Sequence, residues 1–353
     1  MRLGLNLGYW GSGKDRDELE LAITAEELGY AVCWAAEAYG SDAPTVLSWV
    51  AAKTSTIDIG AAVMQIPARS PAMTAMTAAT LDALSGGRFR LGLGLSGPQV
   101  SEGWHGVRFG AGLARTREYV DVVRMALRRE RVQYQGEHFT LPLPDGPGKA
   151  LQLTVRPVRA DIPVYLGAVG PKNLALTGEI ADGWLGVLFS PEHGALSLDP
   201  LRTARAAAGR GTAEDPLAGF DIAPTVSVSL ADDVATAADA VRPYVALYVG
   251  GMGSRDKNFY NALIRRMGYE DVAEQVQELY LSGKPREAAA ALPVDLLDHL
   301  NLLGSRDRLV ERLQAYAAAG VTTLNVGPSG ASTEEKKHTL RVLAEALEAA
   351  SLT

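Results

Sequence analysis

The stretch AATLDALSGGRFRLGLGLSGPQVSEGWHG, residues 78–106, contains the pattern that decides the fold. Apolar residues at helical spacing lead to a pair of glycines at 86–87, which predicts a helix that ends there. Residues 88–93 then have the pattern of a strand, which breaks at Gly94 and Pro98. Polar and aromatic residues follow at once. Parallel α/β folds place their chemistry at this point, just past the carboxyl end of a strand.

The same stretch fits the dinucleotide-binding pattern G-x-G-x-x-G at Gly92, Gly94 and Gly97. In a Rossmann fold the third glycine lies in the first turn of a helix that packs on the strand. Here Pro98 follows directly, and no continuous helical pattern begins before Ala114. We therefore reject the Rossmann interpretation.

Alternation of strand and helix patterns continues along the chain and predicts a parallel sheet. Eight strands and about eight main helices indicate an α/β protein with a (β/α)8 TIM barrel. We expect one domain, residues 1–353, with insertions at about 131–161 and 242–301. The expected strands are residues 2–7, 30–36, 57–64, 88–93, 163–167, 183–188, 221–229 and 322–327. The main helices are 15–28, 44–53, one that follows Pro71 and ends at 84, 114–129, 171–180, 199–208, 305–319 and 334–349.

Composition narrows the classes of function. The 353 residues are 47% hydrophobic and carry a net charge of −7, with basic residues scattered along the chain. Nucleic acid and membrane surfaces are therefore not expected partners. The sequence begins without a signal-peptide pattern and contains one cysteine, so we expect a cytoplasmic protein without disulfides. Its five histidines are far apart in sequence, and no metal site is expected.

Seven further motifs occur in order after residue 106, and with the first stretch they resemble the luciferase-like flavin and deazaflavin oxidoreductases. The similarity is greatest to the bacterial branch of coenzyme F420-dependent oxidoreductases and covers nearly the whole chain. It implies a TIM barrel with insertions, in agreement with the strand and helix pattern, and commonly a homodimer. The motifs are RTREYV, DIPVYLGAVGPKN, EIADGW, DIAPTV, ALYVGGMG, KNFYN and AGVTTLNVG.

The resemblance implies a deazaflavin site at the carboxyl end of the barrel. A bulge in the third strand, commonly with a non-prolyl cis peptide, supports one face of the ring, and a strand-to-helix turn binds the phosphate at a helix N-terminus. The alternatives are an ordinary buried strand and purely structural turns. The implied cofactor-binding residues are Glu37, Ala61, Ala62, Val63, Gln65, Ser96, Gly97, Pro98, Gln99, Ala168, Val169, Gly170, Pro171 and Lys172.

Three residues are candidates for catalysis: Glu37, Glu102 and His105. Histidine titrates near neutral pH and suits proton donation, but a lone histidine is often structural. Several deazaflavin relatives have Asp-His after the second strand, where this chain has Glu37-Ala38, so their sugar-phosphate oxidation is not expected here. Glu37 is a candidate to position the cofactor or relay a proton, or else it caps the following turn.

Aromatic residues near the same end are candidates for the substrate pocket, with packing as the alternative: Tyr9, Trp10, Tyr39 and Trp104. The oligoglutamate tail of F420 implies a basic rim, for which the candidates are Arg69, Arg108, Lys172, Arg255 and Lys257.

The leading hypothesis is hydride transfer between F420 and a small organic substrate with an activated C=C, C=N or C=O bond. One alternative is an FMN-dependent monooxygenase that uses reduced flavin and oxygen. Another is a cofactor-binding protein without turnover.

Overall fold

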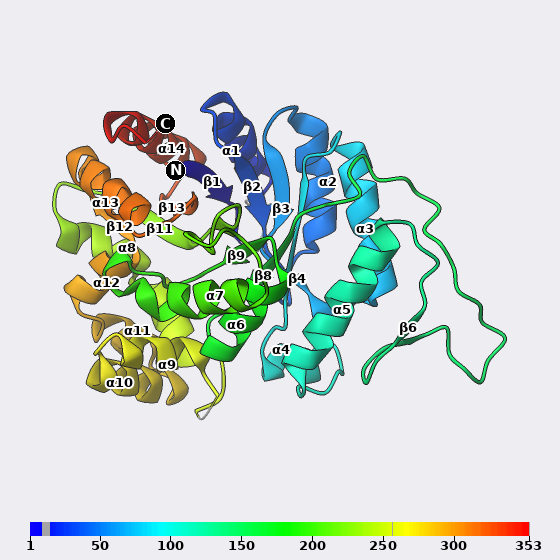
Figure 1. Cartoon of the computed structure of the whole chain (residues 1–353). Helices are drawn as coiled ribbons and strands as arrows, with labels where there is room; N and C mark the ends of the chain where they lie inside the picture. The colour runs from blue at the N-terminus through cyan, green and yellow to red at the C-terminus, as the bar shows by residue number, and fades with distance from the viewer. Residues whose placement is uncertain (9–14, 256, 353) are drawn as a thin grey trace.

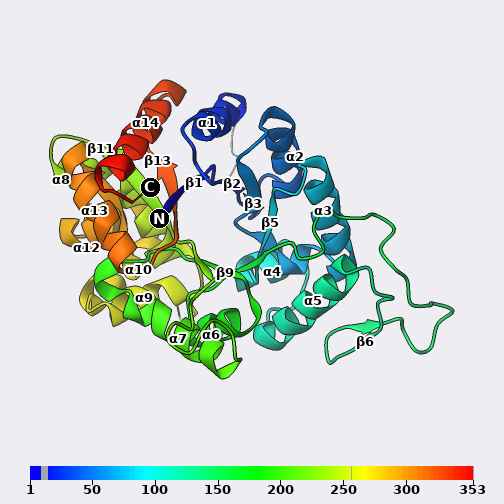
Figure 2. The same ribbon diagram turned by 45° about the horizontal axis from the view of Figure 1, so that its top comes forward.

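The computed structural model describes residues 1–8, 15–255 and 257–352. Within them, eleven strands form one curled sheet in which all neighbouring strands are parallel. Figures 1 and 2 show this sheet surrounded by helices, with the two termini close together. The ammonium group of Met1 donates a hydrogen bond to the Leu352 carbonyl oxygen at 3.0 Å.

The sheet closes into a barrel of eight strand positions. β3 (Asp58–Ala61) is continued by β4 (Met64–Gln65), and β10 (Asp221–Ile222) is continued by β11 (Thr225–Leu230). β10 pairs with β9 and β11 pairs with β13, so these two short strands together close the ring. β12 (Leu302–Gly304) pairs with β11 outside the ring. The other positions are β1 (Arg2–Asn6), β2 (Val32–Ala35), β5 (Phe89–Gly94), β8 (Val164–Gly167), β9 (Gly183–Leu185) and β13 (Thr323–Pro328).

Helices cover the outside of the barrel and confirm the α/β prediction. The main ones outside residues 247–301 are α1 (Asp15–Glu27), α2 (Ala43–Lys53), α3 (Pro71–Leu84), α5 (Gly112–Leu127), α6 (Pro171–Ile180), α7 (Ala195–Ala207), α8 (Val234–Ala246), α13 (Arg306–Ala318) and α14 (Thr333–Ala349). Short helical segments are η1 (Ile66–Ala68), α4 (Pro98–Gly103) and η2 (Pro191–His193). No helix within the described residues is long and apolar enough to span a bilayer.

The two predicted insertions lie in different places. Residues 131–161 form an arm that projects from the barrel in both views, with a small hairpin of β6 (Tyr134–Gln135) and β7 (Thr140–Leu141). Residues 242–301 instead contribute to a helical layer with its own hydrophobic core beside α8. This layer contains η3 (Leu247–Gly251), α9 (Phe259–Arg266), α10 (Glu270–Leu281), α11 (Pro285–Ala290) and α12 (Val294–Leu300).

The predictions for the seventh strand and for the segment just before Ala114 are wrong. The seventh strand is not continuous, because its ladder is interrupted at residues 223–224, where Pro224 lacks the N–H that a ladder needs. A helix also begins before Ala114, because Pro98 starts α4 at the first helical position, where proline is well tolerated. The Rossmann fold is therefore excluded by the closed barrel and not by a proline break.

The amino-terminal end of the barrel is closed by a buried polar cluster. The Arg90 guanidinium donates to Asp58 at 2.8 Å and to Asp221 at 3.0 Å. Burial by itself raises the pKa of Asp221, but hydrogen bonds from Thr322 and Thr323, with nearby arginine charges, hold that pKa below its ordinary value. With this end filled, the space for a ligand lies at the opposite, carboxyl end.

Candidate functional site

A cavity of about 1400 Å³ opens at the carboxyl end of the barrel. Residues at or just after the carboxyl end of seven strand positions line it, together with the first residues of β11 and residues of α4, α5, α6, α8, η3 and α9. The lining is continuous from Val63 past Gly97 to Gly170. Pockets for drug-sized ligands typically have about 300–1000 Å³. The cavity is therefore large enough for a large cofactor with a small substrate beside it.

The bulge predicted in the third strand lies where β3 ends and β4 begins. The peptide bond between Ala62 and Val63 is cis, and both residues line the cavity. Ala61, the last residue of β3, is fully buried. The bulge in the third strand and its cis peptide, which the family resemblance implied, are confirmed, whereas contact with a cofactor ring stays a prediction.

Gln65, Ser96 and His105 form a chain of hydrogen bonds that leads from the protein surface to the cavity. The Gln65 side chain is buried; its Nε2 donates to Ser96 Oγ at 3.1 Å, and its Oε1 lies 2.9 Å from His105 Nε2. Gln65 and Ser96 line the cavity, whereas His105 reaches it only through Gln65. The sequence did not predict this contact.

Glu37 is held by four hydrogen bonds at the cavity wall. Arg69 donates to both carboxylate oxygens at 2.7 Å, and the backbone N–H groups of Ala43 and Gln65 donate at 3.1 Å each. Burial by itself lowers the pKa of Arg69, but the hydrogen bonds and charge of Glu37, with Asp42, raise it above its ordinary value. Glu37 thus anchors the turn after β2 to β4. This engagement favours a positioning role over proton transfer.

Ser96, Gly97, Pro98 and Gln99 line the cavity where β5 passes into α4. Ser96 has a left-handed backbone, with φ of 62°, and Gly97 is the N-cap of α4. The chain turns sharply here, so hydroxyl, amide and backbone groups of these four residues face the cavity together.

The strand-to-helix turn from Ala168 to Lys172 lies on the cavity wall, and all five of its residues line the cavity. Gly170 is the N-cap of α6 and Pro171 occupies the first turn. No side chain in the part of the chain that the structure describes caps this helix, so the N–H groups of its first turn are available to a ligand. The geometry suits an anion such as phosphate.

Four cationic side chains line the cavity without a carboxylate partner among the described residues: Arg108, Arg115, Lys172 and Lys257. Two residues of the expected basic rim are not part of this group. Arg69 is engaged by Glu37 and Asp42, and Arg255 does not line the cavity. Arg115 was missed because its motif, RTREYV, has the pattern of an ordinary amphipathic helix.

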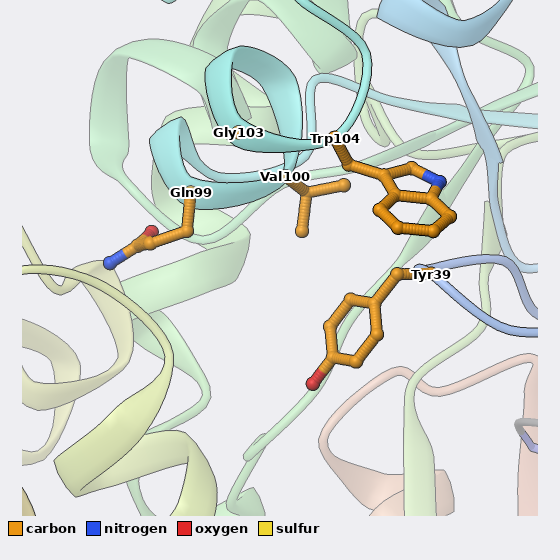
Figure 3. A pocket seen from close by; sticks show the side chains of 5 residues that line it. All are labelled: Tyr39, Gln99, Val100, Gly103 and Trp104. Atoms are coloured by element: carbon orange, nitrogen blue, oxygen red, sulfur yellow. The ribbon is translucent and has the colours of Figure 1, made fainter.

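The remaining predicted residues lie near the entrance. Tyr39 and Trp104, 70% and 67% exposed, line a small recess together with Gln99, and Figure 3 shows the Tyr39 ring below the Trp104 indole. Tyr39 and Gln99 also line the main cavity. Glu102 points to the surface, where its carboxylate accepts the Phe109 N–H at 3.0 Å. Tyr9 and Trp10 lie outside the described residues.

Three tyrosines from the second insertion and its neighbour α8 were not predicted as site residues. Tyr244, Tyr248 and Tyr260 line the cavity, with ring centroids 4.7 Å apart for the first pair and 4.8 Å for the second. The motifs ALYVGGMG and KNFYN contain two of them and were the available signal. By contrast, no described residue of 131–161 lines the cavity, so only the second insertion shapes the site.

Comparison with known proteins agrees with this geometry. A Mycobacterium tuberculosis protein provisionally named coenzyme F420-dependent oxidoreductase Rv3520c is 46% identical over 332 residues, 92% of this chain and 94% of that protein. The 5,10-methylenetetrahydromethanopterin reductase of Archaeoglobus fulgidus is 28% identical over 334 residues, 92% of this chain and 93% of that protein.

The fold comparison gives the same grouping. The solved structure of the coenzyme F420 dependent tetrahydromethanopterin reductase from Methanopyrus kandleri has a TM-score of 0.81 at 26% identity and covers 98% of this chain and 97% of that chain. The family described as Luciferase-like monooxygenase matches residues 8–323. The chain therefore belongs to the luciferase-like monooxygenase family.

Proposed function

We propose that this protein is an F420-dependent oxidoreductase that transfers hydride between the deazaflavin and a small organic substrate. The observation that carries the proposal is the group of cavity-lining cations without carboxylate partners among the described residues, Arg108, Arg115, Lys172 and Lys257. They converge on one cavity in a chain of net charge −7. F420 carries a phosphate and an oligoglutamate tail, so its several negative charges match this set better than the single phosphate of FMN.

The residues of the cavity fit the parts of such a cofactor. Small side chains at Ala62 and Gly97 suit the approach of a flat ring, and the open first turn of α6 with Lys172 suits the phosphate. Arg108 and Arg115 would hold the tail carboxylates. The remaining proposed ring-edge and chain contacts come from Val63, Gln65, Ser96, Pro98, Gln99, Ala168, Val169, Gly170 and Pro171.

When bound, the deazaflavin supplies a hydride at a ring carbon that reacts slowly with oxygen. The protein binds the two reactants side by side and orients them. Glu37 acts by holding Gln65, and Glu102 is too far out on the surface to line the cavity. The proton that completes reduction of a C=C, C=N or C=O group therefore comes from solvent or from a hydroxyl group in the cavity.

Tyr39 and Trp104 are proposed to contact the substrate at the entrance, because they are exposed beside the recess in Figure 3. We also propose a cytoplasmic homodimer. The single cysteine, Cys33, is buried, which agrees with a reducing compartment. Light scattering coupled to gel filtration measures the subunit number, and a monomer mass at micromolar concentration would contradict the dimer.

Anaerobic stopped-flow oxidation of the bound, reduced deazaflavin tests the reaction. A panel of enones, imines and ketones should include an acceptor that oxidises F420H2 in the presence of protein, with no oxygen uptake in aerobic controls. Oxygen uptake coupled to substrate hydroxylation with reduced FMN would support the monooxygenase alternative. Tight F420 binding without oxidation by any acceptor would support a binding protein without turnover.

A further inference from the structure

The hydrogen-bond chain from His105 through Gln65 to Ser96 has a defined direction. The Gln65 Oε1 atom can only accept, so the hydrogen of the His105 contact is on His105 Nε2. The Gln65 Nε2 atom can only donate, so Ser96 Oγ is the acceptor. The Ser96 hydroxyl hydrogen is not used in this chain. Because Ser96 lines the cavity, that hydrogen is available to a ligand there.

Reversing the Gln65 amide would reverse the whole chain. Gln65 Nε2 would then donate to an unprotonated His105 Nε2, and Ser96 would donate to Gln65 Oε1 and present only an acceptor to the cavity. A hydrogen on His105 Nε2 rules out this second arrangement, because two donors would face each other. The hydrogen position on His105 thus sets the polarity of Ser96.

Hydrogen bonds of the Gln65 backbone fix the position from which its side chain contacts His105 and Ser96. The N–H of Gln65 donates to Glu37, whose carboxylate is fixed by Arg69, and β4 pairs with β5 at Gln65 and Gly94. Because the main chain is fixed, the main alternative for the Gln65 side chain is the rotation that exchanges its amide oxygen and nitrogen. Gln65 is only 5% exposed, so water does not readily replace a lost hydrogen-bond partner.

We propose that His105 is a positioning residue that acts through Gln65 to make Ser96 a hydrogen-bond donor toward the cavity. The group that binds at Ser96 is then an acceptor, such as a carbonyl oxygen or an unprotonated ring nitrogen of the ligand. The identity of this ligand as a deazaflavin rests on the proposed function. The hydrogen bonds from His105 through Gln65 to Ser96 do not depend on it.

A double-mutant cycle on binding tests this coupling. His105→Phe removes the donor and keeps a ring, and it should weaken F420 binding about fivefold to tenfold. His105→Gln retains an N–H donor and should stay within about twofold of the unmodified protein. In a Ser96→Ala background, His105→Phe should have no further effect, because the group it controls is gone. An equal loss in both backgrounds would overturn the proposal and indicate a purely structural histidine.

A measurement without any ligand separates this proposal from the proposed function. In ¹⁵N-histidine NMR spectra of the ligand-free protein, neutral His105 should carry its hydrogen on Nε2, and Ser96→Ala should shift that resonance through Gln65. The Nδ1–H tautomer, or a His105 resonance that is unchanged in Ser96→Ala, would overturn the proposed hydrogen-bond direction from His105 through Gln65 to Ser96. If F420 does not bind but FMN does, the proposed function fails and the same cycle is measured with FMN.

Discussion

The buried ion pair between Arg69 and Glu37 should contribute strongly to the free energy of unfolding. Their side chains are 14% and 6% exposed, and two hydrogen bonds of 2.7 Å join them. Arg69→Met removes the guanidinium and leaves the carboxylate buried with two backbone N–H donors among the described residues, those of Ala43 and Gln65. We expect this variant to be markedly less stable.

The magnitude follows from the burial of both groups. Removing one partner of a buried ion pair costs about 3–5 kcal/mol. Slight exposure of Arg69 lets some water reach Glu37, so the lower end of this range applies, about 3 kcal/mol. The second contact of Arg69, with the exposed Asp42, adds under about 1 kcal/mol. The melting temperature should fall by about 5 °C.

Urea unfolding followed by circular dichroism measures the change, with Arg286→Met as the matched control. Arg286 lies on α11, is exposed and has no carboxylate partner among the described residues, so its replacement should change stability by under about 0.5 kcal/mol. Adding Glu37→Gln to Arg69→Met should restore about 1–2 kcal/mol, because the buried charge is then gone. Equal unfolding free energies for Arg69→Met and Arg286→Met would refute the reasoning.

Three further predictions concern packing, pH and charge. Gly92→Ala places a methyl carbon 1.8 Å from a backbone carbonyl oxygen of β3 and should cost at least about 2 kcal/mol in urea unfolding, whereas Gly103→Ala, with open space around it, should be neutral. Burial by itself raises the pKa of Glu192, but hydrogen bonds, chiefly from Arg312, lower it to about 2. This stabilisation is present above the ordinary value of 4.5 and is lost as pH falls toward 2. Between pH 5 and 3 the unmodified protein should therefore lose about 1 kcal/mol more than Glu192→Gln, after allowance for solvent screening; equal losses would contradict this. Lys172→Ala should weaken F420 binding about fivefold at low salt and much less at high salt in fluorescence titrations, and a loss independent of salt would argue against a charge contact.

Sequence patterns predicted the helices and strands whose bounds are set by neighbouring residues. The bounds of α6 were predicted correctly, because Pro171 marks the first turn and apolar spacing defines the rest. The short helix α4 was missed, since six residues that include proline and glycine have no clear periodicity. The arm at 131–161 was predicted as an insertion, but its position away from the cavity depends on tertiary packing alone.

For the site, the sequence indicated the positions of residues but not their hydrogen-bond partners. Residues at strand ends, such as Gln65 and Ser96, line the cavity because the barrel brings the carboxyl ends of its strands together, whereas their predicted contact with a cofactor stays a prediction. The partners of these residues were not predictable. Arg69 contacts Glu37 from 32 residues away, and His105 contacts Gln65 from 40 residues away, so no short spacing in the sequence encodes either contact.

We propose that the cations of the cavity recognise F420 by the several negative charges of its phosphate and glutamate tail. The most direct test compares the dissociation constants, at low and high salt, of F420 and of its chromophore without phosphate and glutamate. F420 should bind at least about 100-fold more tightly than the bare chromophore at low salt, and this ratio should fall as salt increases. Equal affinities, or a ratio independent of salt, would contradict it.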